Sequence, residues 1–364
     1  MPHRRLVRAG ERLLNEIRTR RWPSYSRLFL ASDRSDWVLG NEAREVGAIA
    51  RRLGVRVAST EHASGVRGQA VFYGSHFVLL SPRLLSRNRV AIAYFHGRGF
   101  TPAEPSFAAC FDRLRAEHPR ISRVQVSNRA MRDFVLDSGI ATGKVFVIPI
   151  GVNLAYFPFR TLEQRRTARA RHRIPEGAIV LGSFQKDGVG WGDGREPKLI
   201  KGPDVLLEVV ASLRRTVPEL FVLLSGPARG YVRAGLDALG VPYRHVYPRA
   251  YPEVGTLFQA IDLYVVCSRE EGGPKAVLEA MASGVPLVTT RVGQAPDLVH
   301  HGQNGWLADV EDVDALVHWS AQALRRTPEA ERVVRTARTT AEENAYDRQD
   351  HLWRPFFEGF VERT

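Results

Sequence analysis

The chain has 364 residues, of which 44% are hydrophobic and 25% charged, an ordinary composition for a globular protein of about two domains. No stretch approaches the ~18 consecutive apolar residues of a membrane span, and the N-terminus lacks the apolar core of a secretory signal. Two cysteines, Cys110 and Cys267, exclude a disulfide framework and lack metal-ligand spacing, which fits a reducing cytosol.

The formal net charge of +13 belongs to the first part of the chain. Residues 1–150 hold 25 lysines and arginines against 12 acidic residues, whereas residues 151–364 hold 27 of each. A basic domain favours an anionic partner such as a membrane surface, a lipid phosphate or a nucleic acid. The alternative is the well-solvated surface of an arginine-rich protein.

Residues 4–20 predict an amphipathic helix, because Leu6, Leu13, Leu14 and Ile17 recur near every 3.6 residues among arginines. Such a helix can lie on an anionic bilayer. We favour the alternative, in which its apolar stripe packs on the domain.

Strands then alternate with helices, which predicts an α/β protein with parallel sheets covered on both faces. In the first half, strands are expected at 27–30, 55–58, 70–73, 77–80, 90–94, 123–126 and 145–148, and helices at 42–53, 103–117 and 129–138. In the second half, strands are expected at 179–184, 220–225, 245–247, 263–266 and 287–289, and helices at 204–216, 232–238, 254–260, 275–283 and 313–327. We place the domains at 1–155 and 156–345, with a linker within 151–171. An aromatic-rich helix at 348–361, within a final segment 346–364, is expected to dock firmly.

The segment most informative about chemistry runs from Glu271 to Pro286 and reads EGGPKAVLEAMASGVP. It follows a predicted strand and opens a helix, so Gly272 and Gly273 leave backbone amides at the positive end of the helix dipole, where a diphosphate can bind. Glu271 can face a cleft, and the carboxylate of Glu279 can accept hydrogen bonds from ribose hydroxyls. The alternative is that Glu279 is an ordinary solvated helix residue.

A glycine-rich segment, GSFQKDGVGWGDGREPKLIKGPD, occupies residues 182–204 after the first strand of the second half. Its glycines let the backbone approach a ligand closely, and its lysines can neutralise phosphate charge. The alternative is a flexible loop with scattered charge. The glycine spacing does not fit a NAD-binding fingerprint.

A third segment, Tyr94-Phe-His-Gly-Arg-Gly99, follows a strand of the first half. Ligands in open α/β sheets bind at the carboxyl ends of strands, which favours a binding role for His96, although a lone histidine is more often structural. We identify no Asp-x-Asp motif of the kind that fixes a metal and a sugar diphosphate, and no Ser/His/Asp or Cys/His pairing. Lysines and a helix dipole can neutralise a leaving diphosphate instead.

Together these segments resemble family 4 retaining glycosyltransferases, over roughly residues 85–330. The resemblance rests on Glu271 and Glu279 followed by AMASGVP, and on TRVGQAPDLV from Thr290, HGQNG from His301, VSNR from Val126 and KVFVIPIGVN from Lys144. It implies a GT-B fold, in which two Rossmann-like domains face across a cleft, the first binding the acceptor and the second the nucleotide-sugar, while a C-terminal helix docks back.

The resemblance also implies residue roles. His96, Glu271 and Lys201 would serve catalysis, with His96 and Glu271 touching the donor sugar. The nucleotide-sugar would be held by Glu279, on the ribose, and by Gly272, Gly273, Pro274, Lys275, Lys186 and Ser183. The position of the family's phosphate-binding arginine holds Gln185 or Lys186, followed by an insertion, which leaves the partner of Lys201 open. Asn153 replaces the family's aspartate and receives no role.

The expected function is retaining, metal-independent transfer from a UDP- or GDP-sugar to a glycan or lipid-linked acceptor, as in polysaccharide biosynthesis. The expected place is the cytoplasm, with docking at the inner membrane face. No cofactor beyond the nucleotide-sugar, no metal and no nucleic-acid partner are expected. The alternatives are a sugar-nucleotide epimerase or hydrolase on the same fold, and a non-catalytic nucleotide- or nucleic-acid-binding protein.

Overall fold

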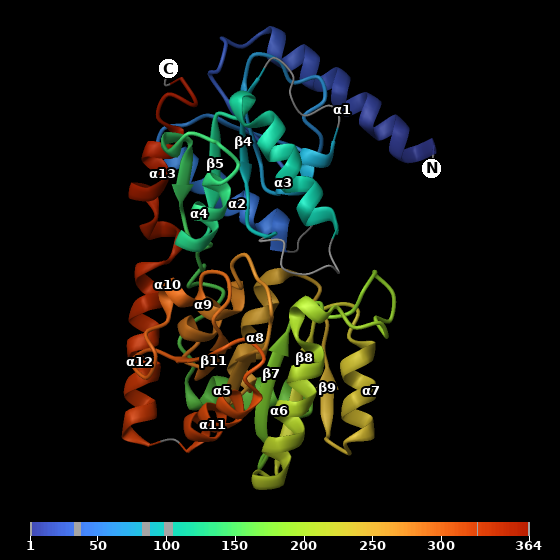
Figure 1. Ribbon diagram of the computed structural model, residues 1–364, viewed down its shortest axis with the longest axis vertical. Helices are drawn as coiled ribbons and strands as arrows, with labels where there is room; N and C mark the ends of the chain where they lie inside the picture. Colours follow the sequence, from blue (N-terminus) through green and yellow to red (C-terminus); the bar gives the residue numbers. More distant parts are fainter. Residues whose placement is uncertain (1, 33–37, 82–87, 98–104, 326, 363–364) are drawn as a thin grey trace. The chain divides into compact units, whose positions relative to one another are not determined.

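The computed structural model describes residues 2–32, 38–81, 88–97, 105–325 and 327–362. The chain divides into two compact units (Figure 1). Unit 1 comprises Met1–Pro149 and Tyr346–Thr364, and unit 2 comprises Ile150–Ala345. The boundary lies six residues before the expected one at 155/156, and the final segment belongs to unit 1.

Unit 1 contains a six-stranded parallel sheet in the order β2-β1-β3-β4-β5-β6. The strands are β1 Leu28–Ala31, β2 Val57–Thr60, β3 Ala70–Tyr73, β4 Arg89–Ala93, β5 Arg123–Val126 and β6 Val145–Val147. The helices are α1 Pro2–Arg20, α2 Val38–Arg52, α3 Pro105–Glu117, α4 Arg129–Leu136 and α13 Asp350–Phe357. Alternate residues of β4 face opposite sides: Ala91 and Ala93 pack in a core with α2 and α13, whereas Val90 and Ile92 pack in one with α3 and α4.

The C-terminal aromatic residues complete the first of these cores. Trp353 and Phe356 are almost fully buried, and each meets the ring of Phe72 edge-on, at centroid distances of 5.9 and 5.6 Å. Phe357 and Phe360 are buried beside them. The prediction that this segment docks firmly is confirmed, because its aromatic side chains are part of the unit 1 core.

Unit 2 repeats the architecture, with the strand order β12-β11-β10-β7-β8-β9. The strands are β7 Ile179–Phe184, β8 Leu220–Ser225, β9 Tyr243–His245, β10 Leu263–Val266, β11 Leu287–Thr290 and β12 Trp306–Ala308. The helices are α5 Leu162–His172, α6 Pro203–Thr216, α7 Gly230–Ala238, α8 Val254–Ala260, α9 Lys275–Ala282, α10 Ala295–Leu298, α11 Val313–Leu324 and α12 Pro328–Glu343. On β10, Leu263 and Val265 join the core under α6, α7 and α11, and Tyr264 packs on Phe258 of α8 at the other face.

The predicted strand at 77–80 is wrong. His76–Leu80 is instead the 3₁₀ helix η1, begun by Ser75, whose hydroxyl accepts from the Phe77 N–H at 3.4 Å. Phe77 and Leu80 are exposed while Leu79 is buried. The short apolar run therefore has only one buried face and carries no signal that separates strand from helix.

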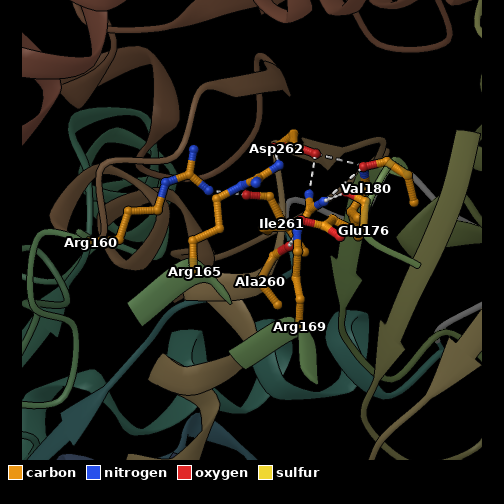
Figure 2. Close-up of polar contacts among 9 residues, drawn as sticks. Arg160, Arg165, Arg169, Glu176, Val180, Ala260, Ile261 and Asp262 are labelled. Carbon is orange, nitrogen blue, oxygen red and sulfur yellow. Dashed lines mark hydrogen bonds and ion pairs between the residues drawn. The ribbon is translucent and has the colours of Figure 1, made fainter. Parts of the chain in front are cut away.

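The predicted linker at 151–171 is also wrong over its second half, which forms α5. Thr161 caps this helix in a reciprocal capping box with Gln164. Arg169 on α5 is 4% exposed and forms an ion pair of 2.5 Å with Asp262, as Figure 2 shows. Since the buried face of α5 includes a paired arginine, the usual apolar pattern of a helix is missing from the sequence.

Helix α1 turns its apolar side away from unit 1, contrary to the expectation from the sequence. Leu13, Leu14 and Ile17 are exposed, whereas Asn15 and Thr19 are buried against unit 1. The prediction that the apolar stripe packs on the domain is wrong, because polar side chains hold this helix in place.

Candidate functional site

The loop between β10 and α9 places backbone amide groups at the start of α9. Pro274 is the N-cap residue, so α9 begins at Lys275. The loop from β11 packs tightly beside it: a Cβ on Gly293, whose φ is +53°, would lie 2.9 Å from the carbonyl oxygens of both Glu271 and Gly272. Only glycine fits there, and the contact fixes the Glu271–Pro274 segment at the carboxyl end of the sheet.

Two of the predicted catalytic residues lie together. Lys201 Nζ is 2.7 Å from Glu271 Oε2, and the Ser268 hydroxyl donates to Glu271 Oε1 at 2.9 Å. The side chains of Lys201 and Glu271 are 18% and 8% exposed. Gly202, with φ +61°, makes this possible, since a Cβ there would lie 1.9 Å from the carbonyl oxygen of Cys267. The segments that follow β7 and β10 thus meet through this charge pair.

Glu279 lies on α9 but is only 5% exposed, so the alternative of a solvated helix residue is wrong. The Tyr251 hydroxyl donates to its Oε1. Burial raises the pKa of the Glu279 carboxyl, while the nearby Lys275 cation and the Tyr251 hydrogen bond oppose the rise. Sequence reasoning missed Tyr251, because nothing near it in the chain marks a partner that lies 28 residues away.

The glycine-rich segment has a fixed base rather than a freely flexible one. Arg229, 1% exposed, donates to the Ser183 carbonyl at 2.7 Å and to the Ser183 hydroxyl at 3.1 Å, and its Nε lies 2.9 Å from Asp187 Oδ1. Burial raises the pKa of the Asp187 carboxyl, and the Arg229 cation opposes the rise. Ser183, a predicted ligand-binding residue, is therefore part of the support of this loop.

Lys186, which with Gln185 is a candidate for the position of the family's arginine, has its ammonium 4.1 Å from the centroid of the Trp191 ring. The Trp191 side chain is 80% exposed. A cation above an indole face is attracted by the ring quadrupole. Arg229 was missed by sequence reasoning because it comes from the segment after β8, and its burial excludes it from direct contact with a ligand.

His96 lies at the carboxyl end of β4 in unit 1, as expected. Its ring stacks on Phe107 at 5.8 Å with an interplanar angle of 5°, and the His76 ring is 5.9 Å away. His76 is buried, and its Nε2 has no hydrogen-bond partner among the described residues. Burial, with a smaller effect of His96, lowers the pKa of His76 to about 3. Arg98 and Gly99 of the third segment lie outside the described residues.

The described part of the chain presents neither a metal-binding cluster nor a membrane-spanning helix. No group of three His, Cys, Asp or Glu side chains there could hold a metal ion. Asp312-Val-Asp314 has Asp-x-Asp spacing, but Asp312 caps α11 by accepting from the Ala315 N–H at 2.9 Å. None of the described helices is long and apolar enough to span a bilayer.

Part of the chain is similar in sequence to a known family. Residues 196–340, which include Lys201, Glu271 and Glu279, match the family described as glycosyl transferases group 1. Over this range the chain is therefore similar to group 1 glycosyl transferases. This match and the fold confirm the resemblance to GT-B glycosyltransferases.

Curated relatives include D-inositol 3-phosphate glycosyltransferases. That of Corynebacterium urealyticum is 30% identical over 195 residues, covering 50% of this chain and 43% of the relative. That of Mycobacterium leprae is 30% identical over 292 residues, covering 72% of this chain and 63% of the relative. The chain therefore spans less than two thirds of these relatives.

Solved structures share the fold over nearly the whole chain. Anabaena Alr3699/HepE in complex with UDP and glucose has a TM-score of 0.71 at 14% identity, covering 92% of this chain and 99% of that one. Sucrose-phosphate synthase from Thermosynechococcus elongatus also has a TM-score of 0.71, at 16% identity, covering 92% of this chain and all of that one. The two parallel six-stranded sheets with flanking helices are thus those of a GT-B fold.

Proposed function

We propose that this protein is a retaining, metal-independent glycosyltransferase of family 4 that moves a sugar from a nucleotide-sugar to a glycan or lipid-linked acceptor. The observation that carries the proposal is the Lys201–Glu271 pair, 2.7 Å long, beside the start of α9 at the carboxyl end of the unit 2 sheet. Ligands of open α/β sheets bind at this end. The matched family supports the reaction class.

The proposed roles of Lys201, Glu271 and Glu279 follow from their charges. The Lys201 ammonium has three N–H donors, and its contact with Glu271 leaves donors for a diphosphate. With the backbone amides at the start of α9, it would stabilise the negative charge that develops on the leaving diphosphate. Glu271, oriented by Ser268 and Lys201, would accept from hydroxyls of the donor sugar. Glu279 would bind the ribose.

The donor is proposed to be a UDP-sugar, with a GDP-sugar as the alternative. Alr3699/HepE, which shares the fold, was solved with UDP and with UDP-glucose. Thermal unfolding with UDP, UDP-glucose, GDP and GDP-mannose tests the choice, because a ligand at 100 times its Kd stabilises the protein by about 2.7 kcal/mol. Stabilisation by none of the four would contradict a nucleotide-sugar site.

Lys201→Ala tests the diphosphate assignment. The variant should lose more affinity for the nucleoside diphosphate than for the monophosphate or the free nucleoside, because the removed charge faces the diphosphate. Lys144→Ala, in unit 1, is the control, since that lysine donates to backbone carbonyls of His118 and Pro119. Equal losses for all three ligands would make Lys201 a structural residue.

The acceptor is proposed to be anionic or carried on a lipid diphosphate. The excess of basic residues lies in 1–150, most of unit 1, and the relatives are named for an inositol phosphate. Release of nucleotide that depends on added acceptor separates a transferase from an epimerase or hydrolase. Inositol 3-phosphate and uncharged inositol form a matched first pair of acceptors. We further propose a cytoplasmic protein that docks reversibly at the inner membrane face.

A further inference from the structure

Helix α1 is attached to unit 1 by its polar side. Glu11 accepts from the Thr60 hydroxyl at 2.9 Å and from the Glu61 N–H at 2.8 Å. One turn later, Asn15 Nδ2 donates at 3.2 Å to the same Thr60 hydroxyl and to the His62 carbonyl. Asn15 is 2% exposed, so this attachment is a formed interface rather than a loose surface contact.

Close backbone packing extends the attachment. A Cβ on Gly65, whose φ is +85°, would lie 2.3 Å from the Arg12 carbonyl oxygen, so the loop between β2 and β3 fits closely against the helix backbone. Thr19, 7% exposed, lies one turn beyond Asn15 on the same side. The residues at positions 11, 15 and 19 therefore define the domain-facing side of α1.

The opposite side is apolar and exposed. Leu13, Leu14 and Ile17 are 59%, 43% and 46% exposed. At about 100° per residue, Leu13 and Ile17 lie on the side of the helix opposite Asn15, and Leu14 borders that side. The rest of unit 1 packs on the other face of this helix, so it does not shield these side chains from water. Another apolar phase would have to cover them.

Basic residues border this apolar face. Arg18 follows Leu14, and Arg20 follows Ile17, by about one turn on the helix surface, and both arginines are exposed. Arg12 is 63% exposed and pairs with Glu16 at 3.1 Å. Long arginine side chains on both flanks can reach lipid phosphates while neighbouring leucines enter the headgroup region.

We infer that α1 is a membrane-docking helix, which inserts Leu13, Leu14 and Ile17 into a bilayer containing anionic lipid while Glu11 and Asn15 keep it fixed to unit 1. Charge complementarity selects the occupant: residues 1–150 carry 25 basic against 12 acidic residues. A second copy of the chain on the same face would bring like-charged arginines together, whereas anionic headgroups neutralise them. The inference rests on the membrane docking proposed above and names the surface that performs it, which the sugar-transfer site does not use.

The test measures binding of the full chain to vesicles of phosphatidylcholine with phosphatidylglycerol, and of phosphatidylcholine alone. The wild type should bind the anionic vesicles at low salt and lose affinity as salt rises, because surface charges are screened over about 8–10 Å at physiological ionic strength. Leu13→Ser/Leu14→Ser/Ile17→Ser should weaken binding by about tenfold or more at each salt concentration. The matched control, Leu162→Ser/Leu239→Ser/Val310→Ser, replaces exposed apolar residues of unit 2 and should bind as the wild type does.

A second readout follows the helix itself. Cys110 and Cys267 are both buried, so Ile17→Cys can be labelled selectively with an environment-sensitive fluorophore. Its emission should shift to the blue with anionic vesicles, and that of a labelled Leu162→Cys should not. Wild-type binding by the triple serine variant, or no binding of the wild type at low salt, would overturn the inference. So would a dimer that the triple variant abolishes without any vesicle binding, since a second copy would then cover the face.

Discussion

Two of the charge pairs in unit 2 lie at opposite ends of the strands of one sheet. At the amino edge, Arg169 pairs with Asp262 at 2.5 Å, and the two side chains are 5% and 2% exposed. At the carboxyl edge, Lys201 pairs with Glu271 at 2.7 Å, with 18% and 8% exposed. The pairs have similar lengths, so pair geometry by itself does not separate a structural role from a functional one.

The two pairs differ in how many hydrogen-bond donors of the cation have partners within the protein. Arg169 also donates to the carbonyls of Ala260 at 3.0 Å and Ala178 at 2.9 Å, and Asp262 accepts from the Val180 N–H at 2.9 Å (Figure 2). Lys201 Nζ contacts Glu271 and keeps a partly open ammonium. A saturated pair ties strands together, whereas an unsaturated one can still bind a ligand.

The largest expected effect is at the saturated pair. Asp262→Ala should lower the free energy of unfolding by about 3–5 kcal/mol, because Arg169 would stay buried without its counter-charge. Chemical denaturation measures the loss. The control is Asp309→Ala, which breaks the exposed pair with Arg291 and should cost below about 1 kcal/mol. Similar losses for both variants would remove the distinction between buried and exposed pairs here.

At the Lys201–Glu271 pair, a substitution should change the rate of sugar transfer more than the stability. Glu271→Gln keeps an oxygen for the Ser268 hydroxyl but removes the charge that Lys201 faces. Sugar transfer should fall by about 10²–10³-fold if the side chain orients the donor in the transition state. The denaturation midpoint should stay close to wild type. A large loss of stability with unchanged transfer would instead place this pair in the same class as Arg169–Asp262.

Glu279 lies between the two cases, since it is buried yet predicted to bind ligand. Glu279→Ala should cost about 1–3 kcal/mol of stability, because the Tyr251 hydroxyl loses its buried acceptor. Glu279→Gln retains an acceptor oxygen, so it should keep most of the stability while weakening nucleotide binding. Calorimetric titration with UDP measures the second effect. Wild-type affinity in the Gln variant would reject the ribose assignment.

The effect that is smallest near neutral pH concerns His76 in unit 1. His76 has a folded-state pKa lowered to about 3 from 6.5, so the unfolded chain binds its proton more readily. The contribution of neutral His76 to the free energy of unfolding is complete above about pH 6.5. It is lost on acidification, at up to ~1.4 kcal/mol per pH unit. His76→Phe should flatten the stability profile below pH 6.5, with exposed His351→Gln as control. Parallel profiles for wild type and His76→Phe would contradict a buried neutral imidazole.

The features that could be predicted best from the sequence are those that a local pattern of residues determines. The bounds of β7, β8 and β10 agree with those expected, because fully buried parallel strands read as continuous apolar runs between turn residues. Lys201 and Glu271 were selected from motifs at the ends of such strands, and the fold brings them together across 70 positions.

What the sequence could not supply depends on tertiary partners. Helix α5 was missed because Arg169 is buried through its contacts with Asp262 and backbone carbonyls. The burial of Glu279 depends on Tyr251, and the orientation of α1 depends on a loop about fifty residues away. In each case a polar group is buried because a distant partner satisfies it, and hydrophobic periodicity carries no record of that partner.

The return of the chain to unit 1 at Tyr346 has a consequence for synthesis on the ribosome. The strand residue Phe72 is made early, but Trp353 and Phe356, which cover it, follow only after about two hundred residues of unit 2. At translation rates of about 5–20 residues per second, unit 1 waits ~10–40 s with part of its apolar core uncovered. Unit 2, a continuous segment, can complete its core first. During that interval unit 1 presents nascent-chain surface of the kind that chaperones bind, so the translation of α13 sets when this unit becomes resistant to proteolysis.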